Sequence, residues 1–242
     1  MLTPLEVIDL SKNYNGKEAV KNISFKVNKS EIIGILGPNG CGKTTTIGMI
    51  LGLLKPSSGK VLINGNEVEL KRVELLDNIN FISPYIELPK KLTVKQNLEV
   101  YGRLYDIKNI KLKIKDISEK LRLDEIINKI TGELSSGQKN RVSLAKSIIN
   151  DPKVLLLDEP TASLDPETGD FVRSFLEDYQ KEKGASILLA SHNMAEVERL
   201  CSFVLMMNNG VIIDQGSPSK LIERHGRKNM EEVFLKLARK TI

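Results

Sequence analysis

The stretch GPNGCGKTT, residues 37–45, constrains the fold of this chain more than any other. It follows the apolar run Ile32 to Leu36, which predicts a buried strand, and it precedes a pattern typical of a helix. The stretch satisfies G-x-x-x-x-G-K-[ST], a pattern that arises by chance in roughly one per cent of chains of this length. Strand, glycine-rich turn and helix in this order predict a phosphate-binding loop. The alternative is an ordinary strand-to-helix turn.

Each residue type in this loop has a physical reason. Glycines let the backbone curl so that successive N–H groups point into one concavity, and the following helix adds its positive N-terminal end. Lys43 supplies a mobile charge for the β- and γ-phosphates, the Thr44 hydroxyl suits Mg²⁺, and Thr45 adds a donor for the α-phosphate. The loop residues predicted to bind the nucleotide are Gly37, Pro38, Asn39, Gly40, Cys41, Gly42, Lys43, Thr44 and Thr45.

A second motif places two acids directly after the apolar run Val154 to Leu157. A carboxylate at the carboxyl end of a parallel strand faces the crevice where ligands bind. Asp158 is therefore expected to hold Mg²⁺ through water, and Glu159 to orient or deprotonate the attacking water. The alternative is that the two acids only begin a turn at Pro160.

Alternating strand and helix patterns predict an α/β fold with a mainly parallel sheet of the P-loop NTPase type, N-terminal antiparallel strands and an inserted helical subdomain. The expected strands are Leu5–Leu10, Ala19–Val27, Glu31–Leu36, Gly59–Asn64, Lys153–Leu157 and Ser186–Ala190. The expected helices include 42–53, Lys139–Ile149, 166–183 and Asn193–Arg199. We expect a single domain over 1–242, with the helical subdomain at about 85–150.

The start of the helical subdomain carries the clearest helical signal. Thr93 and Gln96 form a predicted capping box. The apolar residues that follow it fall at helical spacing and are expected to pack into the core. They are Val94, Leu98, Tyr101, Leu104 and Tyr105.

Composition narrows the possible environments. No apolar run approaches the roughly 18 residues of a membrane span, and the N-terminus lacks the apolar core of a secretory signal. The two cysteines, Cys41 and Cys201, are too few for a disulfide framework. The net charge of +5 arises from lysines spread among nearly as many acids, which predicts solvated faces rather than a nucleic-acid surface. We expect a cytosolic, reduced protein that binds no nucleic acid.

The segment Leu134-Ser135-Ser136-Gly137-Gln138 narrows the class further, because it precedes a helical pattern. It is similar to the LSGGQ signature of the ATP-binding cassette family, with Ser136 in place of the first glycine. Other features resemble that family's motifs in their order along nearly the whole chain. Tyr14 resembles the aromatic that stacks on adenine, Asp165 lies in a segment like the D-loop, and His192 follows a strand as the switch histidine does.

The resemblance implies a composite ATP site. Two cassettes pack head to tail as a homodimer or with a second cassette, and ATP at Lys43 of one is covered by Ser135 and Gly137 of the other. Asp165 is expected near that interface. Lys43, Glu159 and His192 are the expected catalytic residues, and Thr44 with Asp158 the expected ligands of Mg²⁺.

The resemblance also implies a partner. An ATPase subunit of a transporter meets a separate membrane permease, which places this chain peripherally on the cytoplasmic face of the cell membrane. The segment Met230–Leu235 resembles the tail of cassettes from ABC-2 type export systems. Two alternatives remain open: a soluble cassette ATPase in cofactor assembly, and a weakly hydrolysing ATP-dependent regulator. The cargo is not encoded in these residues.

Two positions depart from the family pattern or from an ordinary loop. The family's glutamine after the strand ending Asn80-Phe81-Ile82 is missing, and Ser83-Pro84-Tyr85 stands there. Either Ser83 or a backbone group substitutes for the glutamine, or hydrolysis is slow.

Cys41 lies at a predicted helix N-terminus, which predicts a lowered pKa of its thiol and an alkylation that bound ATP blocks. The alternative is a small residue filling a tight loop.

Overall fold

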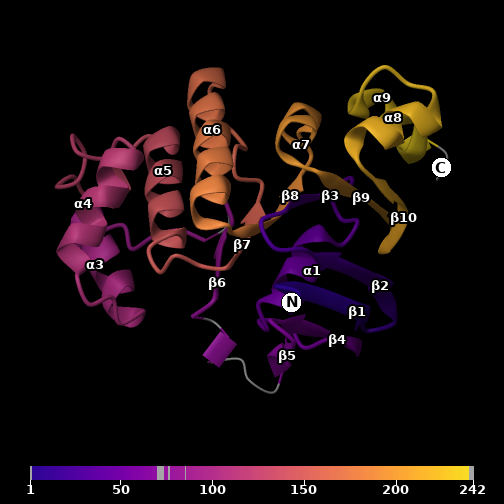
Figure 1. The fold of residues 1–242 in the computed structure, drawn as a ribbon, viewed down its shortest axis with the longest axis horizontal. Coiled ribbons are helices and arrows are strands. Elements are labelled where there is room, and N and C mark those ends of the chain that lie inside the picture. Colours follow the sequence, from indigo (N-terminus) through magenta and orange to yellow (C-terminus); the bar gives the residue numbers. More distant parts are fainter. Residues whose placement is uncertain (1, 70–73, 76, 85, 240–242) are drawn as a thin grey trace.

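A computed structural model describes residues 2–69, 74–75, 77–84 and 86–239. Two sheets form its centre (Figure 1). The first is antiparallel and has the order β2-β1-β4-β5. Its strands are β1 (Leu5–Tyr14), β2 (Lys17–Val27), β4 (Ser58–Ile63) and β5 (Asn66–Glu67).

The second sheet has six strands in the order β10-β9-β3-β8-β7-β6. All neighbours are parallel except β10, which pairs with β9 in the antiparallel sense. The strands are β3 (Ile32–Leu36), β6 (Ile79–Ile82), β7 (Val154–Asp158), β8 (Ser186–Ser191), β9 (Phe203–Asn208) and β10 (Val211–Gly216). Their parallel arrangement brings the ends of β3, β7 and β8 to one edge, where parallel sheets bind ligands.

Residues of the parallel sheet face two hydrophobic clusters in turn, because strand side chains alternate between faces. Leu155 and Leu157 of β7 pack in the cluster that includes residues of the surrounding helices. Val154 and Leu156 pack in the cluster shared with the antiparallel sheet and α1 (Lys43–Ile50). Burial on both faces explains why β3, β7 and β8 read as continuous apolar runs.

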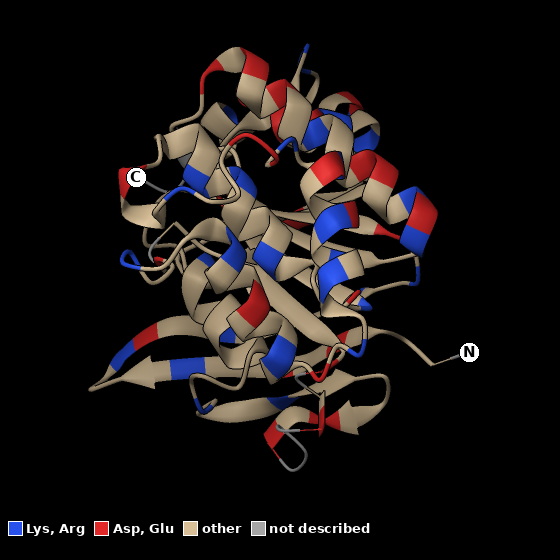
Figure 2. Cartoon of the chain, turned by 90° about the vertical axis from the view of Figure 1, so that its left-hand side faces the viewer, with Lys and Arg blue, Asp and Glu red and all other residues tan. Residues whose placement is uncertain are grey.

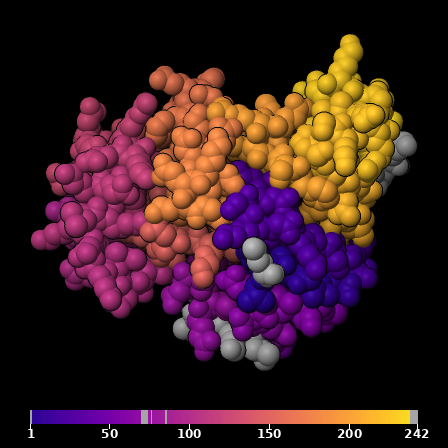
Figure 3. All heavy atoms as spheres, viewed as in Figure 1, coloured from indigo at the N-terminus to yellow at the C-terminus, as the bar shows by residue number. Residues whose placement is uncertain are grey.

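The other helices whose bounds the structure describes form three groups (Figure 1). One group stands at one end of the molecule beyond β6, a second lies over the middle of the sheet, and the third lies at the opposite end (Figure 3). They are, in that order, α3 (Val94–Leu104), α4 (Ile110–Lys120) and α5 (Ser136–Ser147); α6 (Pro166–Lys183) and α7 (Met194–Leu200); and α8 (Pro218–His225) and α9 (Met230–Arg239). A short 3-10 turn, η1 (Thr131–Glu133), precedes α5.

Most predicted elements are confirmed to within a few residues, and the 166–183 helix matches α6. The capping box of Thr93 and Gln96 is formed by two reciprocal hydrogen bonds of 2.8 and 3.1 Å. The core prediction for Leu104 is wrong, because its side chain is 73% exposed at the last turn of α3. Tyr101 and Tyr105 are partly buried against the core as predicted.

The distribution of charge and the length of the helices can be compared with the expectations from composition. Figure 2 views the helical end and shows acidic and basic residues interspersed over its helices. No helix among the described residues is long and apolar enough to cross a membrane.

Candidate nucleotide-binding and hydrolysis site

The glycine-rich loop between β3 and α1 closes around the ammonium group of Lys43. The Lys43 Nζ donates hydrogen bonds to the carbonyl oxygens of Gly37 (2.6 Å) and Pro38 (3.3 Å). The side chain is buried, so this cation is held inside the loop rather than in solvent. A buried positive charge ringed by backbone groups at a helix N-terminus is suited to an anion.

Glycine is required at two loop positions by close backbone contacts. A Cβ on Gly37 would lie 2.2 Å from the carbonyl oxygen of Met207. Gly42 has a φ of 112°, and its Cβ would lie 2.6 Å from the carbonyl oxygen of Ala19. The loop is therefore pressed against β9 and β2, which fixes where its N–H groups point.

Thr44 and Asp158 are brought together although they lie 114 positions apart in the sequence. The Thr44 Oγ1 donates to Asp158 Oδ2 at 3.3 Å. Burial raises the pKa of Asp158, and the Thr44 hydrogen bond and the charge of Lys43 offset part of that rise. No group of three or more His, Cys, Asp or Glu side chains suited to a metal occurs among the described residues. A hydroxyl beside one carboxylate nevertheless fits Mg²⁺, which takes most of its other ligands from water and phosphate.

Glu159 and His192 face each other across the ends of β7 and β8. The His192 Nδ1 lies 2.7 Å from Glu159 Oε2, and the His192 backbone N–H points to the same oxygen at 3.4 Å. Glu159 has a φ of 52°, a left-handed conformation held by a 2.8 Å hydrogen bond from its N–H to the Ala190 carbonyl. Glu159 lines the same cavity as residues of the phosphate loop.

These side chains share one cavity of about 520 Å³. Its lining brings together residues from the phosphate loop, the end of β7 and the segment after β8. They are Ala19, Asn39, Gly40, Gly42, Lys43, Thr44, Thr45, Pro84, Asp158, Glu159, Ala162, Ser163 and His192.

The four predicted signature residues lie at the start of α5. Ser135 and Gln138 form a capping box with hydrogen bonds of 3.1 and 3.3 Å, and Ser135 is exposed. Asp165 caps α6 by accepting from the Thr168 N–H at 2.9 Å, a contact that lowers the Asp165 pKa. The described lining of the 520 Å³ cavity includes neither the signature residues nor Asp165. Within one chain, the structure does not bring these groups to the phosphate loop.

Two further predicted residues, Tyr14 and Cys41, are not in the described lining of the 520 Å³ cavity. Tyr14 ends β1 with 44% of its surface exposed, and the Lys12 Nζ lies 5.1 Å from its ring centroid. Cys41 is buried, and its sulfur would lie only 2.5 Å from a Cβ on Gly37. Burial raises the Cys41 pKa, with only partial offset by the charge of Lys43. The hypothesis of a lowered Cys41 pKa is therefore wrong, because desolvation outweighs the nearby cation. The burial of Cys41 against Gly37 agrees with the alternative, a small residue that fills a tight loop.

Where the family glutamine was expected, Pro84 reaches the 520 Å³ cavity. Proline has neither a side-chain donor nor a backbone N–H, so it offers no hydrogen bond from those groups to the attacking water. Ser83 lines a neighbouring cavity of about 250 Å³ together with Glu159 and Ser136. Tyr85, the third residue of this departure, lies outside the described residues.

Sequence reasoning missed three polar residues that hold the loops of the site. The Asn140 Nδ2 donates to the Pro160 carbonyl at 2.6 Å, and Thr161 and Glu196 join in a buried hydrogen bond of 2.8 Å. Glu196 offered one signal, since it falls four residues after His192, on the first turn of a predicted helix. Asn140 offered none, because its partner is a backbone atom from another element.

Lys43 is enclosed by a glycine-rich loop, and Thr44, Asp158 and Glu159 lie beside it at the edge of a parallel sheet. This arrangement defines a P-loop nucleoside triphosphatase. The family model described as ABC transporter matches residues 20–162. The ABC transporter ATP-binding protein NatA of Bacillus subtilis (strain 168) is 33% identical over 238 residues, covering 96% of each chain. The chain belongs to the ABC transporter family, in which it is an ATP-hydrolysing subunit.

Two other matches agree with this assignment. The Nod factor export ATP-binding protein I of Rhizobium sp. (strain N33) is 35% identical over 232 residues, covering 95% of this chain and 76% of that protein. A solved structure described as the ATP-binding subunit of an ABC transporter superposes with a TM-score of 0.89 at 27% identity, covering 98% of this chain and 100% of the other. The α/β fold with mixed parallel and antiparallel strands is that of ABC ATPases.

Proposed function

We propose that this chain binds Mg-ATP with residues 37–45 and hydrolyses it with Glu159 as general base. One observation carries the proposal: Lys43, Thr44, Asp158, Glu159 and His192 come from three segments and line the same cavity. Phosphoryl transfer depends mainly on positioning and charge stabilisation, and this set supplies a cation, a metal-binding pair, a base and an imidazole.

Each residue has a proposed role. Lys43 holds the β- and γ-phosphates. The backbone N–H groups of the loop and the Thr45 hydroxyl hold the remainder of the triphosphate, including the α-phosphate. Thr44 and Asp158 hold Mg²⁺, which when bound neutralises phosphate charge. Glu159 takes the proton of the attacking water, and His192, 2.7 Å from it, orients that carboxylate and reaches the γ-phosphate. Tyr14 stacks on the adenine ring, as an exposed aromatic at the end of β1 can.

The active unit in this proposal contains two cassettes, either two copies of this chain or this chain with a second one. The N-terminus of α5, with Ser135, Ser136, Gly137 and Gln138, covers ATP held at Lys43 of the other cassette. Two features support this arrangement: Ser135 is exposed, and the described lining of the 520 Å³ cavity that contains Lys43 includes none of the signature residues. Asp165, exposed at the start of α6, lies at the same interface.

The permease partner and the location are also proposals. The chain forms one domain over 1–242 with a helical subdomain at about 85–150, and it docks peripherally at the cytoplasmic face of the membrane on a separate permease. The name of the Rhizobium relative, a Nod factor export ATP-binding protein, supports export through an ABC-2 type system. Pro84 in place of glutamine supports a second candidate, a regulator with slow hydrolysis.

Turnover and assembly of one variant test the proposal. Glu159→Gln removes the base while keeping the shape, so kcat is expected to fall at least about 100-fold while Mg-ATP binding is retained. The variant is expected to form a stable dimer in Mg-ATP, measured by light scattering, and Glu125→Gln on an exposed surface of the helical region serves as the control. A Glu159→Gln protein that turns over normally, or stays monomeric in Mg-ATP alone and with its permease, overturns the proposal. Wild-type turnover near zero favours the regulator.

A further inference from the structure

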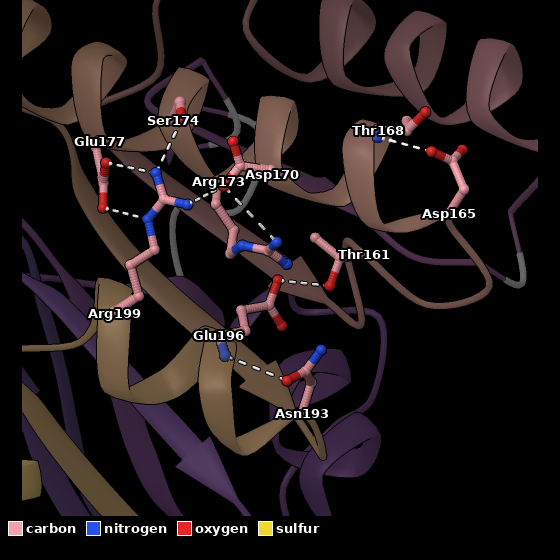
Figure 4. Close-up of polar contacts among 10 residues, drawn as sticks. All are labelled: Thr161, Asp165, Thr168, Asp170, Arg173, Ser174, Glu177, Asn193, Glu196 and Arg199. Atoms are coloured by element: carbon pink, nitrogen blue, oxygen red, sulfur yellow. Dashed lines mark hydrogen bonds and ion pairs between the residues drawn. The ribbon is translucent and has the colours of Figure 1, made fainter.

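We propose that Glu196 is a positioning residue that holds the Glu159 loop and the His192 loop in register for hydrolysis. Glu196 lies on the first turn of α7 and is 1% exposed. Its Oε1 accepts a 2.8 Å hydrogen bond from the Thr161 hydroxyl, and its Oε2 accepts a 2.6 Å bond from the Ser191 hydroxyl. Figure 4 shows the carboxylate between the Thr161 segment and the start of α7.

The two hydroxyls belong to the loops that carry the facing pair. Thr161 follows Glu159 by two residues, and Ser191 directly precedes His192. The Ser191 oxygen also accepts from the Asn193 N–H at 3.0 Å, so the residues on either side of His192 are tied to each other. One buried carboxylate therefore braces both sides of the 2.7 Å contact between Glu159 and His192.

A carboxylate at the position of Glu196 is costly to bury. Burial raises its pKa, and the hydroxyls of Ser191 and Thr161 offset part of that effect. An apolar side chain would fill the same space without desolvation cost. What it would lack is a pair of acceptors on one rigid group, which can hold two hydroxyl donors from separate loops at once. The arrangement is therefore explained by loop positioning better than by packing.

The helix that carries Glu196 has an independent anchor. The Arg199 guanidinium bonds Glu177 at 3.0 Å and Ser174 at 2.8 Å, and it also pairs with Asp170, all on α6 (Figure 4). Because these bonds attach α7 to α6 without Glu196, a change at Glu196 is expected to loosen the two loops and leave α7 in place.

The test compares Glu196→Leu with Glu198→Leu, the same change on the exposed face of α7. Glu198 accepts a 2.5 Å hydrogen bond from the Met230 N–H of α9, so this control also removes a carboxylate hydrogen bond, but one outside the Glu159 and His192 loops. We expect kcat for Mg-ATP to fall about tenfold or more in Glu196→Leu, with KM within about twofold of wild type, and to stay near wild type in Glu198→Leu. Glu196→Gln should recover most of kcat, because its carboxamide can accept from one hydroxyl and donate to the other. Wild-type kcat in Glu196→Leu overturns the proposal.

A second measurement does not depend on turnover. This inference rests on the proposed function, in which Glu159 is the base. The nitrogen-15 resonance of His192 Nδ1 reports its contact with Glu159 whether or not that role is correct. It is readily assigned because the chain has only two histidines. We expect this resonance to move in Glu196→Leu and not in Glu198→Leu, and an unchanged resonance overturns the positioning role.

Two single-arm variants keep the proposal testable if Glu196→Leu fails to fold. Thr161→Val and Ser191→Ala each remove one hydroxyl and keep most of the side-chain volume. Each is expected to lower kcat severalfold with little change in KM. Wild-type kcat and an unmoved His192 resonance in both variants would show that the carboxylate does not hold the loops.

Discussion

The side-chain amide of Asn140 donates a 2.6 Å hydrogen bond to the backbone carbonyl of Pro160. Asn140 lies on α5, the helix that begins at the signature residues, and Pro160 directly follows Glu159. The bond joins two regions that are proposed to touch different ATP molecules in a closed dimer. We therefore expect a movement of α5 to be transmitted to the loop that carries Glu159.

Removing this bond should slow hydrolysis. Asn140→Leu keeps the approximate volume and eliminates the donor, and a hydrogen bond of this kind contributes about 1 kcal/mol. If the bond positions Glu159, kcat is expected to fall about fivefold with KM for ATP unchanged. Steady-state ATPase assays measure both quantities. An unchanged kcat would show that the loop is positioned without α5.

A pair of glycine variants tests how tightly the phosphate loop is packed. Gly37→Ala places a methyl 2.2 Å from the Met207 carbonyl oxygen, whereas a Cβ on Gly40 meets nothing within 4 Å and costs only the strain of its φ of 79°. We expect losses of unfolding free energy of about 3 kcal/mol or more for Gly37→Ala and about 1 kcal/mol for Gly40→Ala. Thermal melts should rank the variants in that order. Equal Tm values would mean that the loop relaxes away from β9.

Local pattern was enough to predict most of the fold. The buried strands were recognisable because a strand covered on both faces must be apolar throughout, as Val154 to Leu157 is. The boundaries of α6 coincide with typical cap residues, Asp165 before Pro166 and Gly184 after Lys183, a signal in the sequence that supports the predicted range 166–183. Leu104 was misplaced because helical spacing indicates a face but not where the helix leaves its neighbours.

The position of the phosphate loop beside Asp158 and Glu159 was predictable because each motif is contiguous and follows a buried strand, and the roles of these residues stay predictions. The residues that brace the site were not. Glu196 and Thr161 are 35 positions apart and form one hydrogen bond only because β7 and β8 are neighbours. The electrostatics of Cys41 depended in the same way on burial, which spacing alone does not indicate.

The raised pKa of Cys41 predicts slow reaction with thiol reagents. A pKa above the ordinary value leaves less thiolate at any pH below it, and the thiolate is the reacting form. Cys201 is also buried with a raised pKa. At pH 8 we expect labelling by a disulfide reagent to be at least about 100-fold slower in the native chain than in the denatured one. Fast native labelling that Mg-ATP blocks, in a Cys201→Ser background, would contradict this expectation.

Lys146 predicts an unusual dependence of stability on alkaline pH. Its ammonium lies 4.8 Å from the ring centroid of Phe81 and 5.3 Å from that of Tyr101, and burial lowers the pKa of Lys146 from 10.5 to about 8. Between these values the unfolded chain holds a proton that the folded chain lacks. The unfolded state therefore binds more protons, and the free energy of unfolding rises with pH through this window.

The matched variant Lys146→Met isolates this effect, because it keeps an unbranched side chain and removes the titrating group. Between pH 7.5 and 10 we expect the free energy of unfolding of wild type, relative to Lys146→Met, to rise by up to about 1.4 kcal/mol per pH unit. Thermal melts should show this as a growing difference between the two Tm values. The two ring contacts favour the ammonium and reduce the size of the rise. A Tm difference that stays constant or falls over this range would show that the rings and the carbonyl of Phe81, 3.3 Å from the Lys146 Nζ, keep Lys146 charged in the folded chain.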